Sequence, residues 1–157
     1  MISAQIKALK GLAGKKVEAG WFESNKYAPR GADGTEEFVA RIARIQEYGA
    51  VFSRPSPKGP IRIIIPSRPF MRGAYKNFLE KRRSIEHSIA KKLFDGSINA
   101  DQAVGQIAMA LEGLIVDSIR NGDWEPNAPS TISKKGFDKP LIDSAIMWQS
   151  VNSKVTG

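Results

Sequence analysis

Few side chains in this sequence could carry out catalysis at neutral pH. The chain has no cysteine and a single histidine, His87, which excludes thiol nucleophiles, zinc–thiolate sites and histidine-rich metal sites. Its acidic residues form no recognisable pair: Glu36 and Glu37 are adjacent and point to different faces of a helix, and Asp138 and Asp143 are five positions apart. We therefore expect no enzymatic activity, no bound metal and no cofactor. A metal-dependent nuclease, which needs converging carboxylates, is the least favoured alternative.

The basic residues are a more informative group. The chain carries 24 Lys and Arg against 16 Asp and Glu, a formal net charge of +8. Such an excess serves contact with nucleic acid, an anionic membrane surface or an acidic protein, and it also occurs on a solvated surface without a partner. One run has no acid among its basic residues, which are Arg54, Lys58, Arg62, Arg68, Arg72 and Lys76. Because most of this run is rich in proline, it does not predict a basic helix lying in a groove of DNA.

Residues 50–66 predict an extended, proline-rich arm. Prolines at positions 55, 57 and 60 exclude regular structure for most of residues 50–60, and the β-branched run Ile61–Ile65 predicts an edge strand. A long connection without structure of its own is unusual in a compact domain and is usually functional. We expect this arm to be mobile or to pack on another subunit, and not to be buried in its own domain.

The elements before the arm can be predicted from the spacing of apolar side chains. Ile2, Ile6 and Leu9 predict a helical face at the amino terminus, and the alternation over residues 15–22 predicts a strand. Thr35, followed by two acids, predicts the start of a helix that ends at Gly49.

Two long helices are predicted after the arm. The first begins after Pro69 and ends at Gly96, with a basic face opposite its apolar stripe. The second begins with Asn99 and Gln102 in the spacing of a capping box and ends at Gly122. It contains glycines at positions 105 and 113. Each weakens the helix by about 1 kcal/mol relative to alanine, so we expect another backbone to pack closely against them.

The last third predicts shorter elements: a helix over residues 130–135, a helix that begins at Pro140 and includes Trp148, and a closing strand over residues 150–155. The predicted fold class is α+β, with a small mixed or antiparallel sheet packed against two long helices and an extended proline-rich arm at about residues 50–66. The length fits one domain, residues 1–157. No apolar run reaches the ~18–20 residues of a membrane span, and none has the form of a signal peptide, so we expect no contact with a membrane.

Three segments together resemble a known family. Residues 40–49 read ARIARIQEYG and residues 65–72 read IPSRPFMR, while residues 122–151 combine a Trp and Pro-Asn turn with Ser-Thr-Ile, Lys-Lys-Gly-Phe-Asp and Lys-Pro-Leu-Ile-Asp. In this order, the set resembles the neck and tail-completion proteins of the phage virion-morphogenesis group. The resemblance covers roughly residues 17–151. One departure is that the family usually has Thr-Gly where this chain has Ser144 and Ala145.

The resemblance implies a structural virion protein of a tailed phage or prophage, without enzymatic activity. Such a protein would form a homo-oligomeric ring, commonly hexameric, at the head–tail junction. Its implied partners are the tail tube protein and the head-closure or connector protein, with DNA passing through the lumen as a further contact. The absence of cysteine agrees with assembly in the host bacterial cytoplasm. The alternative is a nucleic-acid-binding protein that uses the basic run 54–76 and a face carrying Arg72, Lys76 and Arg83.

The predicted contact residues lie in the arm and at its junction with the first long helix. Arg68, Pro69 and Phe70 combine a charge, a rigid turn and an aromatic anchor. This combination fits a subunit interface, which we favour, and it also fits a strand-to-helix corner within the monomer. The predicted subunit or partner contacts are Arg54, Lys58, Arg62, Ile63, Arg68, Pro69, Phe70 and Arg72.

Overall fold

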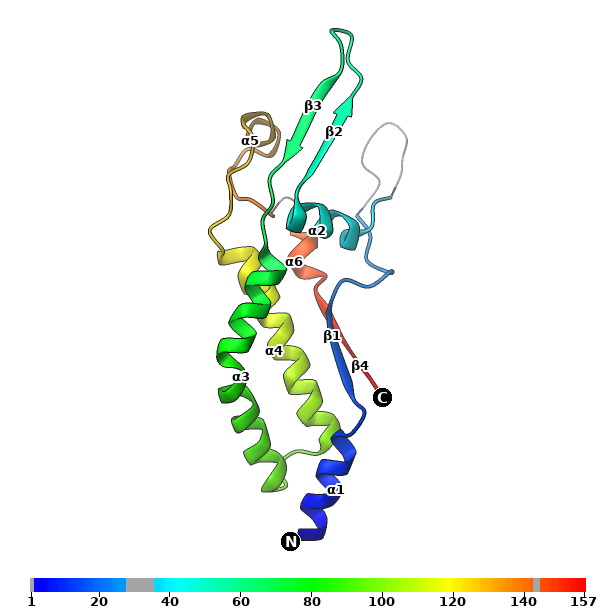
Figure 1. Cartoon of the computed structure of the whole chain (residues 1–157), viewed down its shortest axis with the longest axis vertical. Coiled ribbons are helices and arrows are strands. Elements are labelled where there is room, and N and C mark those ends of the chain that lie inside the picture. Colours follow the sequence, from blue (N-terminus) through cyan, green and yellow to red (C-terminus); the bar gives the residue numbers. More distant parts are fainter. Residues whose placement is uncertain (1, 28–35, 143–144) are drawn as a thin grey trace.

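The computed structural model describes residues 2–27, 36–142 and 145–157, and it has the α+β class predicted from the sequence. The molecule is elongated, with the arm at one end and the amino-terminal helix at the other (Figure 1). The elements in chain order are α1 (Ile2–Leu12), β1 (Lys16–Gly20), α2 (Val39–Tyr48), β2 (Ala50–Arg54), β3 (Ile61–Ile65), α3 (Phe70–Phe94), α4 (Ala100–Asn121), α5 (Pro129–Lys135), α6 (Ile146–Gln149) and β4 (Asn152–Thr156).

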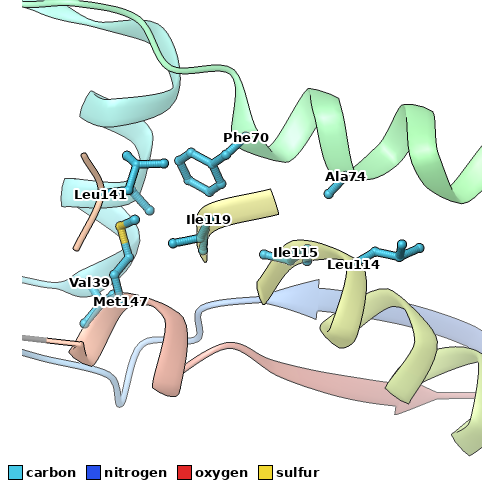
Figure 2. Close-up of a cluster of buried hydrophobic side chains, with 9 residues drawn as sticks. Val39, Phe70, Ala74, Leu114, Ile115, Ile119, Leu141 and Met147 are labelled. Atoms are coloured by element: carbon cyan, nitrogen blue, oxygen red, sulfur yellow. The ribbon is translucent and has the colours of Figure 1, made fainter. Parts of the chain in front are cut away.

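The two long helices, α3 and α4, pack side by side and form the body of the molecule (Figure 1). Their ends confirm the sequence prediction: α3 begins directly after Pro69, and the Asn99 side chain accepts from the backbone N–H of Gln102 in a complete capping box at the start of α4. The main core lies between them at the end nearest the arm, where Phe70 and Ile119 are fully buried (Figure 2). Burial of such large apolar side chains supplies most of the stability of a domain of this size.

The strands β1 and β4 form an antiparallel pair that packs against α4. Val17 lies opposite Val155, so the predicted closing strand is confirmed and the sheet joins distant parts of the chain. Beyond this pair, the Trp21 ring meets the Phe70 ring edge-on at 5.8 Å, and its Nε1 donates to the carbonyl oxygen of Met147 at 2.7 Å. The sheet is thereby fixed to the main core.

The arm is a second antiparallel pair, β2 and β3, and is a hairpin that projects from the body (Figure 1). Its register runs from Ala50 opposite Ile65 to Arg54 opposite Ile61. Residues 55–60 are irregular, as the prolines predict, whereas residues 50–54 form a strand that was not predicted, because the prolines begin only at position 55 and leave the main-chain donors of residues 50–54 intact. The predicted small sheet is therefore two separate ladders.

Two helix boundaries differ from the prediction. The helix expected to start at Thr35, which lies outside the described residues, starts at Val39, because Phe38 is extended and bridges to Lys26. The helix expected from Pro140 is limited to Ile146–Gln149. Leu141 and Ala145 have φ of 63° and 61°, in the left-handed region, and they interrupt the helical pattern.

The structure adds detail on packing at α1 and α4. The face of α1 that carries Ile6 and Leu9 is exposed, and Ala8 and Leu12 instead pack against a second buried cluster at the far end of α3 and α4. In α4, no atom lies within 4 Å of the position that a Cβ would take at residue 105 or residue 113. No other backbone of the same chain packs against these two glycines, so the expectation of a close neighbouring backbone stays a prediction.

Candidate interaction arm and its base

The arm exposes apolar side chains on both of its faces. Val51 and Ile64, a cross-strand pair, are 58% and 61% exposed. On the opposite face, Phe52 lies across from Ile63, and the Phe52 side chain is exposed as well. An isolated two-stranded hairpin is marginally stable in water, and an exposed apolar patch of this kind marks an interaction site. The arm is therefore a candidate binding element.

The tip of the arm is positively charged. Arg54, Lys58 and Arg62 are exposed, and residues 50–66 contain no acidic side chain. A surface that is apolar along the strands and basic at the tip complements an apolar groove with acidic residues at one end. The arm is therefore apolar along its strands and basic at its tip.

A buried glutamate, Glu47 at the end of α2, fixes the base of the arm to α3. Its side chain is almost wholly inaccessible and accepts from the backbone N–H of Met71 at 2.7 Å and of Arg72 at 3.3 Å. The Arg72 Nε also donates to Glu47 at 2.8 Å. The first turn of a helix has unpaired N–H donors and a partial positive charge, so a carboxylate is favourable there. Glu47 therefore caps α3 from another helix.

Arg68 is the second buried charge at the base, with 3% of its surface exposed. Its guanidinium donates to the carbonyl oxygen of Glu125 at 2.8 Å, to Oε1 of Gln46 at 2.6 Å and to the carbonyl oxygen of Pro126 at 3.1 Å. Burial lowers the pKa of Arg68, and the charges of Glu125 and Asp138 oppose that shift. Arg68 thus joins the end of β3 to α2 and to the turn after α4.

The chain turns from α2 into β2 at Gly49, where φ is 75°. A Cβ at this position would lie 2.8 Å from the carbonyl oxygen of Ile65 and 3.0 Å from the nitrogen of Ser67. Both the backbone conformation and this close approach require glycine. The hydroxyl of Ser67 donates to the carbonyl oxygen of Glu47 at 2.7 Å, so both ends of the hairpin are fastened at one place.

The structure separates the predicted contact residues into two groups. Arg54, Lys58, Arg62 and Ile63 belong to the arm, where the first three are exposed and Ile63 is half-buried.

The second group lies at the base. The interface interpretation of Arg68 and Phe70 is wrong, because both side chains are buried in the subunit, and the alternative of a strand-to-helix corner describes them. Pro69 is half-buried at that corner. The exposed Arg72 side chain is held by Glu47, and its guanidinium carbon lies 5.3 Å from the centre of the Tyr48 ring.

Sequence reasoning missed Glu47 and Ser118. The Ser118 hydroxyl is buried and donates to the carbonyl oxygen of Phe70 at 2.8 Å. A signal for Glu47 exists, because it follows Val39 and Ala43 at intervals of four residues, and the structure buries these three side chains. An acid in line with a buried helical stripe indicates a carboxylate that has a fixed internal partner.

Among the residues that the structure describes, no three His, Asp or Glu side chains lie close enough together to hold a metal ion. His87 is exposed on α3. Within the same ranges, every buried side-chain nitrogen or oxygen has a hydrogen-bond partner.

No protein-family model, curated protein or solved structure matches this chain. Within the residues that the structure describes, no helix is both long enough and apolar enough to cross a membrane. A functional assignment therefore depends on the motifs of the sequence and on the arm, its base and the surfaces of the long helices.

Proposed function

We propose that this chain is a structural protein of a tailed-phage or prophage virion, a ring subunit of the neck that completes the tail and joins it to the head connector. The observation that carries the proposal is that the three segments of the family resemblance meet at the base of the arm. Gln46 and Glu47 come from the first segment, Arg68 from the second, and the carbonyl groups of Glu125 and Pro126 from the third. The three segments are far apart in the sequence, and their contact in one hydrogen-bond network supports the resemblance to this family.

A backbone angle gives independent support. The family resemblance expects glycine at position 145, and Ala145 has φ of 61°, a conformation that alanine rarely adopts and glycine adopts readily. The third segment is also tied together internally, because Asp138 accepts from the backbone and side-chain nitrogens of Asn127, each at 3.1 Å. These features favour the family over a chance match of short motifs.

The arm supplies the means of assembly in this proposal. A ring is built from heterologous contacts, in which one surface of a subunit meets a different surface of the next. A projecting hairpin with exposed apolar side chains reaches beyond its own body, and prolines at positions 55, 57, 60 and 66 protect it from uncontrolled strand pairing. The arm then contacts a second copy, the tail tube protein or the head-closure protein.

The proposal is tested by removing the gene from the phage or prophage that encodes it. Electron microscopy of the particles is expected to show full heads and tails that do not join, or tails that end abnormally. The double variant Val51→Thr, Ile64→Thr keeps the strand propensity of the arm, removes apolar surface and is expected to reproduce the defect. The exposed substitution Val155→Thr on β4 serves as the matched control and is expected to complement fully. Normally joined particles without the protein would contradict the proposal.

The charge on α3 favours nucleic-acid binding as a second candidate. This helix carries seven Lys and Arg residues, at positions 72, 76, 81, 82, 83, 91 and 92, against two glutamates. Binding through several phosphates makes affinity fall by about 10³–10⁵ between ~50 and ~200 mM salt. Filter retention of duplex DNA over this salt range measures the effect. A steep loss supports direct DNA binding, and a flat, weak response leaves the ring assignment as the better account of α3.

A further inference from the structure

The two long helices differ in charge. In α3, seven basic residues stand against two acidic ones. In α4, the charged residues are three acids, Asp101, Glu112 and Asp117, with a single basic residue, Arg120, in the last turn. In a chain with net charge +8, a long helical face without Lys or Arg before its last turn is unusual. One helix is therefore electrostatically complementary to the other.

The outer face of α4 has an apolar centre. Gly105, Met109 and Gly113 follow one another at intervals of four residues and therefore lie on one side of the helix. Met109 is 70% exposed, and neither glycine has a neighbour of its own chain at the position of a Cβ. Each glycine destabilises the helix by about 1 kcal/mol relative to alanine, without any packing benefit within the subunit. A flat helical surface of this kind allows another helix to approach closely.

The outer face of α3 has the matching features. Leu79 is exposed, and Lys76 and Arg83 flank it at helical spacing on the same side. In the described part of the chain, the side chains of Lys76 and Arg83 make no hydrogen bond or ion pair, whereas Arg82 is engaged by Glu86. On α3, Leu79 lies between two cations, Lys76 and Arg83. On α4, Met109 lies between two glycines and has acids nearby. The two surfaces are therefore complementary in shape and charge.

We propose that the outer face of α3 in one subunit packs against the outer face of α4 in a second copy of this chain. Leu79 then lies beside Met109, in the space left by the two glycines, and Lys76 and Arg83 face Glu112 and Asp117. The two surfaces are different, so the contact is heterologous and propagates from subunit to subunit until it closes. The closure of these contacts into a ring depends on the proposed function. The contact between two copies does not, and the experiments below test it independently.

Engineered disulfides test the contact directly, because the chain has no cysteine of its own. The Leu79→Cys variant is mixed with ¹⁵N-labelled Met109→Cys variant under mild oxidation, and mass spectrometry identifies the mixed disulfide. The control replaces the second variant with Val155→Cys, an exposed position on β4. We expect at least ten times more mixed disulfide with Met109→Cys than with the control. Equal yields, or only like-with-like dimers, would overturn the proposal.

Charge reversal tests the electrostatic part of the contact. The double variant Lys76→Glu, Arg83→Glu, introduced into the Leu79→Cys chain, is expected to reduce the yield of mixed disulfide at least threefold. Adding Glu112→Lys, Asp117→Lys to the Met109→Cys partner is expected to restore it, whichever way the helices run. If reversal on α3 abolishes DNA retention but leaves the disulfide yield unchanged, the face serves nucleic acid and the proposal fails.

The outcomes separate this contact from the proposed function. A mixed disulfide together with normal virions lacking the gene would retain the contact and reject the role in the neck. Defective virions together with no preferred disulfide would retain the role and reject the contact.

Discussion

The arm and its base are adjacent in the sequence and differ in how their side chains are satisfied. At the base, the charges of Glu47 and Arg68 are buried and each makes several hydrogen bonds within the subunit. In the arm, apolar side chains such as Val51 and Ile64 face solvent on both sides of a two-stranded ladder. The polar groups of the base are satisfied within the subunit, whereas the apolar side chains of the arm stay exposed in the isolated chain.

The comparison shows how a hairpin of marginal stability can be held in a fixed direction by the residues at its base. Gly49 and Ser67 hold the two ends of the hairpin against one another, and Phe70 anchors the start of α3 in the main core. The base therefore determines where the arm points. Substitutions in the two regions should consequently separate stability from assembly.

The largest expected effect comes from Phe70, which is fully buried. Phe70→Ala is expected to lower the free energy of unfolding by about 3–5 kcal/mol, because it removes apolar contacts and leaves a cavity. Phe52→Ala in the exposed arm is the matched control and is expected to change it by less than about 0.5 kcal/mol. Urea unfolding followed by tryptophan fluorescence measures both. Equal losses for the two variants would remove the distinction between base and arm.

The next effect concerns Arg68. Arg68→Met is expected to cost about 3 kcal/mol, because Gln46 and the carbonyl groups of Glu125 and Pro126 lose their donors in a buried place. Arg62→Met, on the exposed side of β3, is expected to leave thermal stability unchanged. Differential scanning calorimetry of the two variants checks the prediction. A stable Arg68→Met protein would show that water replaces the guanidinium at the base.

Two residues with positive φ should respond in opposite directions. Gly49→Ala is expected to destabilise by about 2 kcal/mol, because the backbone is left-handed and the added methyl group meets the strand end at Ile65. Ala145→Gly is expected to stabilise by about 0.5–1 kcal/mol, since glycine relieves the strain of φ 61° at the start of α6. Chemical denaturation of both variants gives the signs. A destabilising Ala145→Gly would contradict the strain argument.

The smallest effect on stability is expected from shortening the arm. Deletion of residues 54–58 leaves Gly59, Pro60 and Ile61 to connect Ser53 with its cross-strand partner Arg62. The unfolding free energy should change by less than about 1 kcal/mol, because few contacts with the body are lost. Ring formation or head–tail joining should be strongly reduced, as measured by native mass spectrometry and particle counts. A deletion that unfolds the isolated subunit would place the arm in the core.

The parts of the fold that depend on local signals were predictable from the sequence. Pro69 sets the start of α3, the Asn99 and Gln102 capping box sets the start of α4, and Gly136 ends α5 in the left-handed conformation. The alternating pattern over residues 15–22 also predicted β1, and the closing strand was predicted within two residues of its observed bounds. Each of these signals lies within a few residues of the feature that it determines.

The base of the arm was not predictable in the same way. Glu47 meets residues 24 and 25 positions later, and Arg68 meets carbonyl groups 57 and 58 positions later. Glu and Arg are usually exposed on protein surfaces, so their presence in a sequence does not reveal that these two side chains are buried. The basic run from residue 54 to residue 76 looks uniform, yet the structure divides it among the arm, the buried base and the outer face of α3.

The buried face of a short amphipathic helix is hard to predict for a related reason. In α2, Ile42 and Ile45 are half-buried, and the structure buries Val39, Ala43 and Glu47. A helix of a few turns with many apolar residues offers more than one stripe, and the neighbouring elements select among them. The selection depends on tertiary contacts that no local pattern contains.

The antiparallel pairing of β2 and β3 has a mechanical consequence. A pull on the tip is shared by both strands, and the hydrogen bonds between them, which run perpendicular to the strands, do not bear the load. The force enters the body at Ala50 and Ile65, which lie opposite one another at the base. There the Glu47 carboxylate ties the end of α2 to the first turn of α3. Traction on the tip is therefore transmitted to the paired long helices as a unit, and neither strand is peeled from the other.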